Sequence, residues 1–178
     1  NIVVGIVAYF ILFFSAPLIA NFYNTPILSQ LTKVVALNVL INSLAIVQRA
    51  KFTIKVDFKT QAKATTLSVL LSGLLGIYLA YSGFGVWSLA VQSVSRNFLN
   101  VSLLWALSKW KPKRLFSWDS FREMFDYGYK LLLSGLIDTL YRNIYSLVIG
   151  KVFSANDLGN YSRAQQFANF PSSNITGV

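Results

Sequence analysis

The chain has 178 residues, of which 54% are hydrophobic, 15% aromatic and only 12% charged. A soluble domain carries about 25% charged residues, so this composition indicates a membrane protein and excludes a disordered chain. There is no cysteine and no histidine, which excludes a disulfide scaffold, a zinc module and thiol catalysis and removes the commonest general base. We therefore expect a protein without a metal ion or cofactor.

Hydropathy and turn-forming residues divide the sequence into candidate membrane spans. An apolar helix needs about 20 residues to cross the hydrocarbon core of a bilayer. Because the chain begins inside an apolar run and stops without a charged flank, we expect an internal fragment of an all-α, polytopic membrane protein. Five spans and the start of a sixth are predicted at residues 2–20, 28–47, 64–81, 84–107, 129–152 and 161 onward.

The connectors between these spans alternate in charge. Residues 49–63 contain five Lys or Arg and one Asp, and residues 108–126 contain five Lys or Arg and three acidic residues. The other connectors carry no charge except Asp157. Lys and Arg concentrate in short cytoplasmic loops, so we expect both basic connectors to face the cytoplasm. The net charge of +10 then reflects contact with anionic membrane lipids, and no nucleic acid is expected as a partner.

The first basic connector allows two local structures. Residues 51–59 alternate between polar and apolar residues, which is typical of a strand. Lys51, Lys55, Lys59 and Lys63 recur at every fourth position, which would place them along one side of a helix. A lone strand would leave its edges unpaired, so we expect a short interfacial segment that becomes helical toward Lys63.

The second basic connector contains the pattern of a short helix. Ser117 can cap this helix, and Phe121, Met124 and Phe125 would lie on its apolar side. Gly128 allows a break before the next span. We therefore expect two separate helices on either side of Gly128.

Two outer turns share a sequence pattern. Residues 85–92 and 159–166 both read Gly-x-aromatic-Ser-x-Ala-x-Gln. The glycine suits a tight hairpin and the aromatic residue suits the membrane interface. Either a repeated helix hairpin, of the kind found in transporters, or shared hairpin chemistry explains the pattern.

Four longer motifs carry a family resemblance. They are APLIANFY at 16–23, GFGVWSL at 83–89, RN with IGK between 142 and 151, and LGNYSRA at 158–164. In these motifs the chain resembles the lipopolysaccharide-biosynthesis oligosaccharide flippases. These form part of the polysaccharide transporter family, within the multidrug, oligosaccharidyl-lipid and polysaccharide exporter superfamily. The resemblance covers essentially the whole chain.

The resemblance implies that the chain is part of a fourteen-helix, two-lobe transporter. Residues 1–107 would form the third to sixth helices, residues 108–126 the cytoplasmic linker between the lobes, and residues 127–178 the seventh and the start of the eighth helix. The implied cargo is an undecaprenyl-pyrophosphate-linked oligosaccharide. It would cross the bacterial inner membrane for lipopolysaccharide, O-antigen, capsule or exopolysaccharide synthesis, with other proteins of polysaccharide assembly as further candidate partners.

Ionisable residues inside spans are candidate site residues, because they are costly unless they face a polar cavity or a partner. Arg96 has no acidic residue in its span and is accompanied by Asn97. It shares a four-residue spacing with Gln92 and Asn100, which predicts a polar stripe facing a solvent-filled interior. Interhelical hydrogen bonding is the alternative. Asp138 and Arg142, also four residues apart, would either line the same cavity or form a self-neutralising pair that locks two helices together.

Further candidates come from the family motifs and from other polar positions. Asn143 follows Arg142 in one motif and is a cavity candidate. Arg163 lies in the first turns of the last span, where it would contact cargo or extend to the lipid headgroups. Asn38 and Asn42, again four residues apart, would line a cavity face or pack two helices together.

Two other functions are open. A multispan glycosyltransferase or polymerase would use the same lipid-linked donor, but it would need an outer carboxylate as base or metal ligand, for which only Asp157 is available. A cation-coupled drug exporter of the same superfamily would have an acidic, aromatic-lined cavity, of which the sequence shows no sign. We therefore expect a transporter and not an enzyme.

Overall fold

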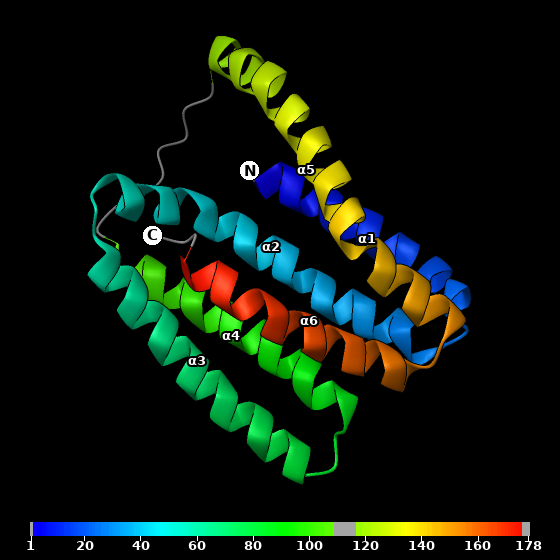
Figure 1. Cartoon of the computed structure of the whole chain (residues 1–178). Coiled ribbons are helices and arrows are strands. Elements are labelled where there is room, and N and C mark those ends of the chain that lie inside the picture. Colours follow the sequence, from blue (N-terminus) through cyan, green and yellow to red (C-terminus); the bar gives the residue numbers. More distant parts are fainter. Residues whose placement is uncertain (1, 109–116, 176–178) are drawn as a thin grey trace. The chain divides into compact units, whose positions relative to one another are not determined.

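The computed structural model describes residues 2–108 and 117–175, and every regular element in these ranges is an α-helix. The all-α prediction is confirmed. The helices fall into two compact units, Asn1–Lys111 and Pro112–Val178. The first unit holds α1 to α4 and the second holds α5 and α6 (Figure 1): α1 Ile2–Phe22, α2 Ile27–Ile54, α3 Phe58–Tyr81, α4 Val86–Leu107, α5 Trp118–Val152 and α6 Ala155–Ile175.

Three of these helices, α1, α2 and α3, are long and apolar enough to cross a membrane. They contain the first three predicted spans and identify the chain as a membrane protein. The fourth and fifth predicted spans are present as α4 and α5, although polar residues such as Arg96 and Asp138 lower their hydropathy. That α4 and α5 cross the bilayer stays a prediction.

Two helix hairpins pack together in the first unit. α1 packs along α2, α3 packs along α4, and α2 packs along α4, so the spatial order is α1, α2, α4, α3 (Figure 1). Small residues let membrane helices approach closely, and a Cβ added at Gly76 of α3 would come within 2.8 Å of Gln92 Cδ on α4. The face of α3 toward α4 consists of buried small residues at four-residue spacing: Ala64, Ser68, Ser72 and Gly76.

The three hairpin turns of this unit end their first helix in the same way. After each helix a residue with positive φ occurs, and the following N–H bonds to the carbonyl five residues earlier. The positive-φ residues of these Schellman motifs are Asn24 (φ 52°), Val56 (φ 57°) and Gly83 (φ 83°). Glycine and asparagine adopt this conformation readily, whereas β-branched Val56 is strained in it. The turn between α2 and α3 is therefore the costliest of the three to form.

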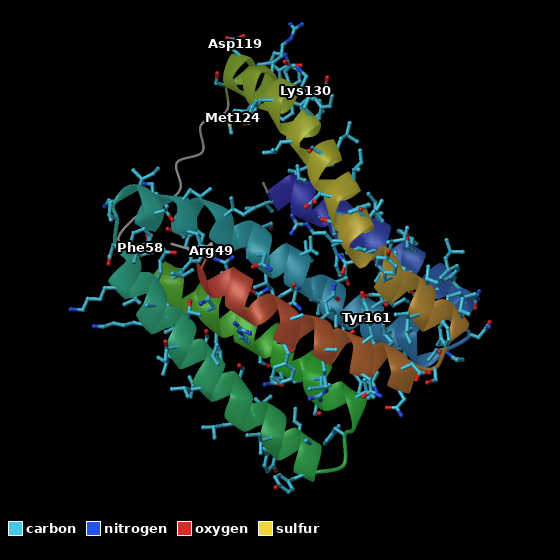
Figure 2. The ribbon with its side chains drawn as sticks, viewed as in Figure 1. Arg49, Phe58, Asp119, Met124, Lys130 and Tyr161 are labelled. Atoms are coloured by element: carbon cyan, nitrogen blue, oxygen red, sulfur yellow. The ribbon has the colours of Figure 1, made fainter. Side chains whose placement is uncertain are left out.

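The first basic connector is helical on both sides of that turn. α2 continues to Ile54 and α3 begins at Phe58, which is labelled in Figure 2. The strand alternative for residues 51–59 is wrong. A helical hairpin pairs its backbone groups within each helix, whereas a lone strand would leave them unpaired.

The carboxylate of Asp57 caps the N-terminus of α3. It accepts a hydrogen bond from the Thr60 N–H at 3.1 Å. Hydrogen bonding to Thr60 lowers the pKa of Asp57 below its usual value, and the charges of Lys55 and Lys59 act in the same direction. Asp57 is thus ionised at neutral pH and committed to starting the helix.

Replacing Asp57 with alanine is expected to lower the thermal midpoint of unfolding in detergent, whereas Asp57→Asn should keep it, because asparagine also caps helices. A lowered folded-state pKa stabilises the fold above the pKa of the unfolded state, and this contribution is lost as pH falls through the folded-state value. The difference between wild type and Asp57→Ala should therefore be full at pH 7 and shrink below about pH 3.8. Equal midpoints at pH 7 would show that the cap contributes nothing.

The second unit contains one long helix, α5, that runs through Gly128 without interruption. The predicted break at Gly128 is wrong, because a helical glycine costs only about 1 kcal/mol relative to alanine. The predicted apolar side is present as stacked or tilted rings from Trp118 through Phe121 and Phe125 to Tyr129, with centroids 5.4, 5.7 and 6.0 Å apart. Figure 2 labels three other side chains of this helix: Asp119, Met124 and Lys130.

The last helix, α6, begins at a capping box. Asp157 accepts hydrogen bonds from the Ser154 N–H and Oγ at 3.1 and 2.6 Å, and Ser154 Oγ accepts one from the Asp157 N–H at 3.2 Å. Gly159 consequently lies inside α6, whereas Gly85 precedes α4 with a φ of 53°. The two copies of the shared glycine pattern are therefore not equivalent hairpin turns.

Candidate functional site

A polar cavity of about 390 Å³ lies between α2, α3 and α4 of the first unit. Among the described residues that line it, all are polar, two are arginines and none is acidic. Polar groups inside an apolar bundle are costly unless they serve a partner or a ligand, so this cavity is the candidate functional site. Its lining residues are Asn38, Asn42, Arg49, Thr65, Ser93, Arg96, Asn97 and Asn100.

Side-chain amides join α2 to α4 along the cavity. Asn38 Nδ2 donates to Ser93 Oγ at 3.2 Å, and Asn97 Nδ2 donates to Asn38 Oδ1 at 3.1 Å. Further along, Trp105 Nε1 donates to the Leu44 carbonyl at 3.1 Å. These bonds fix the register of the two helices, so the positions of the cavity side chains on one relative to the other are set.

Asn100 connects three helices at the end of the cavity nearest the α2–α3 turn. Its Oδ1 accepts a hydrogen bond from Arg49 Nη2 at 3.2 Å, and its Nδ2 donates to Thr65 Oγ1 at 3.2 Å. Asn100 is buried, while Arg49 on α2 is exposed. The rigid amide therefore holds the Arg49 guanidinium in the cavity wall.

Arg96 lies at the middle of α4. It follows Val86, the first residue of the helix, by ten positions, which is about 15 Å along the axis. Among the described residues, no hydrogen bond or ion pair engages its guanidinium, and the side chain is exposed to the cavity. Arg49 and Arg96 thus give the cavity two positive charges without a carboxylate, which favours an anionic ligand.

The predicted stripe on α4 divides between two environments. Arg96 and Asn100 line the cavity, and the predicted α2 residues Asn38 and Asn42 join them there. Gln92 instead lies against Gly76 of α3 and is not a lining residue. At that level the glycine brings α3 and α4 too close together to leave a cavity.

The remaining candidates belong to the second unit. Arg142 Nε lies 2.9 Å from the Asp138 carboxylate, which is the pairing that the four-residue spacing predicts. Asn143 Nδ2 donates to the Thr139 carbonyl at 2.8 Å, so its amide is used within α5. Arg163 is exposed on α6. A common interior shared by these residues and Arg96 stays a prediction.

Sequence reasoning missed three lining residues, Arg49, Thr65 and Ser93. Arg49 was assigned to a connector because hydropathy ended the second span at residue 47, whereas α2 continues to Ile54. A helical signal was present, since positions 38, 42 and 49 fall on one face at 3.6 residues per turn. Ser93 falls on the same face of α4 as Arg96 and Asn100, at three- and seven-residue spacing. No comparable signal marks Thr65 among the small polar residues of α3.

A buried polar side chain on α2 has no hydrogen-bond partner among the described residues. Gln48 is fully buried, and neither atom of its amide makes a hydrogen bond within the described part of the chain. Gln48 precedes Phe52 by one helical turn, and Phe52 packs against Ala64 and Leu104. An unpaired buried amide costs about 1–3 kcal/mol, so Gln48 destabilises the arrangement seen here.

Gln48→Leu is therefore expected to raise the thermal midpoint of unfolding in detergent, because leucine is similar in size and carries no polar group. Asn100→Leu is the matched comparison, because that substitution removes a buried amide that is fully paired, and it should lower the midpoint. A lower midpoint for Gln48→Leu would mean that the amide finds a partner in the full-length protein.

Comparisons with known proteins find a matching family and two relatives. A family model described as polysaccharide biosynthesis protein matches residues 1–178. The chain is 30% identical over 176 residues to the teichuronic acid biosynthesis protein TuaB of Bacillus subtilis (strain 168), covering 96% of this chain and 36% of that protein. It is 23% identical over 171 residues to the succinoglycan biosynthesis transport protein ExoT of Rhizobium meliloti (strain 1021), covering 96% of this chain and 35% of that protein.

No solved structure matches the chain significantly. The chain spans about a third of the length of these two relatives. The family match extends over every residue, including both basic connectors and the polar cavity. The chain therefore belongs to the polysaccharide biosynthesis protein family.

Proposed function

We propose that the protein containing this chain is a flippase that moves an undecaprenyl-pyrophosphate-linked oligosaccharide across the bacterial inner membrane by alternating access. Family membership and the transport role in the name of one relative support this proposal. The observation that carries it is the cavity between α2, α3 and α4, which combines two arginines with neutral hydrogen-bonding side chains and no carboxylate.

The chemistry of this cavity suits a glycan attached to an anionic linkage. An arginine guanidinium forms paired, charge-assisted hydrogen bonds with phosphate oxygens, and lysine cannot reproduce their planar geometry. Asparagine, serine and threonine side chains both donate to and accept from sugar hydroxyls. The cargo is moved without forming or breaking a covalent bond, so no nucleophile, metal ion or cofactor is required.

The proposed orientation places the α2–α3 turn in the cytoplasm, where the cargo is loaded. Its lysines follow the rule that basic loops stay inside. A cysteine in place of exposed Lys55 should react with a membrane-impermeant thiol reagent only when the cytoplasmic side is opened to it. If the cysteine reacts in intact cells, where the reagent reaches only the periplasmic side, the proposed orientation is wrong and every helix runs in the opposite direction.

The two competing functions fit the structure less well. A glycosyltransferase or polymerase would need Asp157 as its base, but Asp157 is held in the α6 capping box, and hydrogen bonds from Ser154 lower its pKa. A lowered pKa makes a carboxylate a weaker base. A cation-coupled drug exporter would use acidic and aromatic residues, and the cavity lining includes neither.

The direct test is translocation by the purified full-length protein in proteoliposomes. Lipid-linked oligosaccharide is placed in one leaflet, and its arrival in the other is followed with a sugar-modifying enzyme that cannot cross the bilayer. We expect transfer of the lipid-linked oligosaccharide only when the protein is present. The same oligosaccharide on an uncharged lipid of the same chain length should not be transferred. Transfer equal to that of protein-free vesicles would contradict the proposal.

A further inference from the structure

A second hollow, of about 530 Å³, lies along the first three turns of α3 and is distinct from the polar cavity. Its lining residues recur every three or four positions: Lys59, Ala62, Lys63, Thr66, Leu67 and Leu70. They occupy the side of α3 opposite the buried stripe that packs against α4. Because α3 is apolar enough to span a membrane, we infer that this exposed side faces lipid.

The end of this groove nearest the α2–α3 turn is positively charged. Lys59 and Lys63 are four residues apart and exposed, and none of the described residues that line the groove is acidic. The nearest carboxylate in the sequence, Asp57, is engaged with the Thr60 N–H. Each of the two lysines lies near the positive end of the helix dipole, which is unfavourable. An anion bound there would offset both of these unfavourable interactions.

The other end of the groove is apolar. Leu67 and Leu70 are 45% and 60% exposed, and Leu70 lies about 16 Å along the helix axis from Lys59. A lysine can extend its ammonium group to the headgroup level while its stem covers apolar surface. One face of α3 therefore carries positive charge at the depth of the lipid phosphates and apolar side chains at the depth of the acyl chains.

We propose that this groove is a binding site for an anionic phospholipid, with the lipid phosphate between Lys59 and Lys63 and one acyl chain along Leu67 and Leu70. Charge complementarity selects an anionic lipid over a zwitterionic one. The site lies on a helix face that does not line the polar cavity. Binding of phospholipid to it can therefore be measured in the absence of cargo.

The proposal is tested by native mass spectrometry of the delipidated full-length protein titrated with phosphatidylglycerol or with phosphatidylcholine. Each lysine near an anionic lipid surface contributes about 1 kcal/mol, so the double variant Lys59→Gln/Lys63→Gln should bind the first phosphatidylglycerol on the order of thirtyfold more weakly. Lys55→Gln is the control, because Lys55 belongs to the same connector but does not line the groove, and its affinity should match wild type.

A second variant tests the apolar half. Leu67→Trp fills the groove and leaves both lysines in place, so it should also weaken phosphatidylglycerol binding. Equal binding of the two lipids by wild type, or unchanged phosphatidylglycerol affinity in the double lysine variant, would overturn the proposal. Weakened binding in the lysine variant with normal binding in Leu67→Trp would also overturn it, because the lysines would then hold a phosphate without an acyl-chain site.

Discussion

Arg96→Gln is expected to reduce delivery of the glycan to the periplasmic leaflet while the protein still inserts and accumulates. Arg96 lies at the middle of α4, lines the polar cavity and makes no internal hydrogen bond or ion pair with the described residues. Removing it therefore breaks no hydrogen bond or ion pair within the described part of the chain. A charge-assisted hydrogen bond is worth about 1.5–3 kcal/mol, so cargo affinity should fall roughly tenfold to a hundredfold.

Two comparisons separate a binding role for Arg96 from a general effect of charge. Arg96→Lys keeps the charge but loses the planar fork, so it should restore transport only in part. Lys55→Gln removes one positive charge outside the cavity and should transport normally. Normal transport by Arg96→Gln, measured as glycan delivered per copy of protein, would exclude Arg96 from cargo binding, and a loss explained only by lower accumulation would make the residue structural.

Asn100→Asp is expected to impair transport almost as strongly, through a different route. A carboxylate at position 100 would still accept the hydrogen bond from Arg49, and Thr65 can rotate its hydroxyl to donate to it. The three-helix connection is kept, but the ion pair neutralises Arg49 and takes one of the two positive charges from the cavity. Cargo affinity should fall on the order of tenfold with little change in the thermal midpoint.

The contrast with Asn100→Leu makes this prediction specific. Leucine leaves the Arg49 guanidinium and the Thr65 hydroxyl without their partner, which costs about 1–3 kcal/mol, so stability falls first. Arg49→Gln should match Asn100→Asp in transport, because both remove the same charge. Full transport by Asn100→Asp, with a normal midpoint, would exclude Arg49 from cargo binding.

The sequence predicted the helical architecture well because its signals are local. Apolar runs and charged connectors mark helices and turns directly, and α1, α2 and α3 contain the first three predicted spans. Helix ends were less predictable. Gly128 did not end a helix, α2 ran past residue 47, and the cap at Asp57 was not anticipated. Each of these helix ends is set by several weak local preferences for helix or turn, and the packed structure decides among them.

The cavity was predictable only in part. Arg96 and Asn100 were singled out because a cation and an amide inside a span are rare enough to notice. Gln92 shares their spacing, yet it lies against Gly76, and only the packing of α3 on α4 reveals this. Arg49 lines the cavity because α2 extends past residue 47 and because its guanidinium donates a hydrogen bond to Asn100 on α4. The sequence pattern of one helix does not reveal a contact between two helices.

The most direct measurement is the reactivity of a single cysteine at Ser93, which lines the cavity beside Asn38. The chain has no cysteine, so in a full-length protein otherwise free of cysteine this thiol is unique. Phe98→Cys is the control, because Phe98 is exposed on α4 but does not line the cavity. A charged thiol reagent should label Ser93→Cys much faster than Phe98→Cys, and lipid-linked oligosaccharide should slow the labelling. Equal labelling of the two cysteines, or labelling that cargo does not affect, would contradict an aqueous cargo site between α2, α3 and α4.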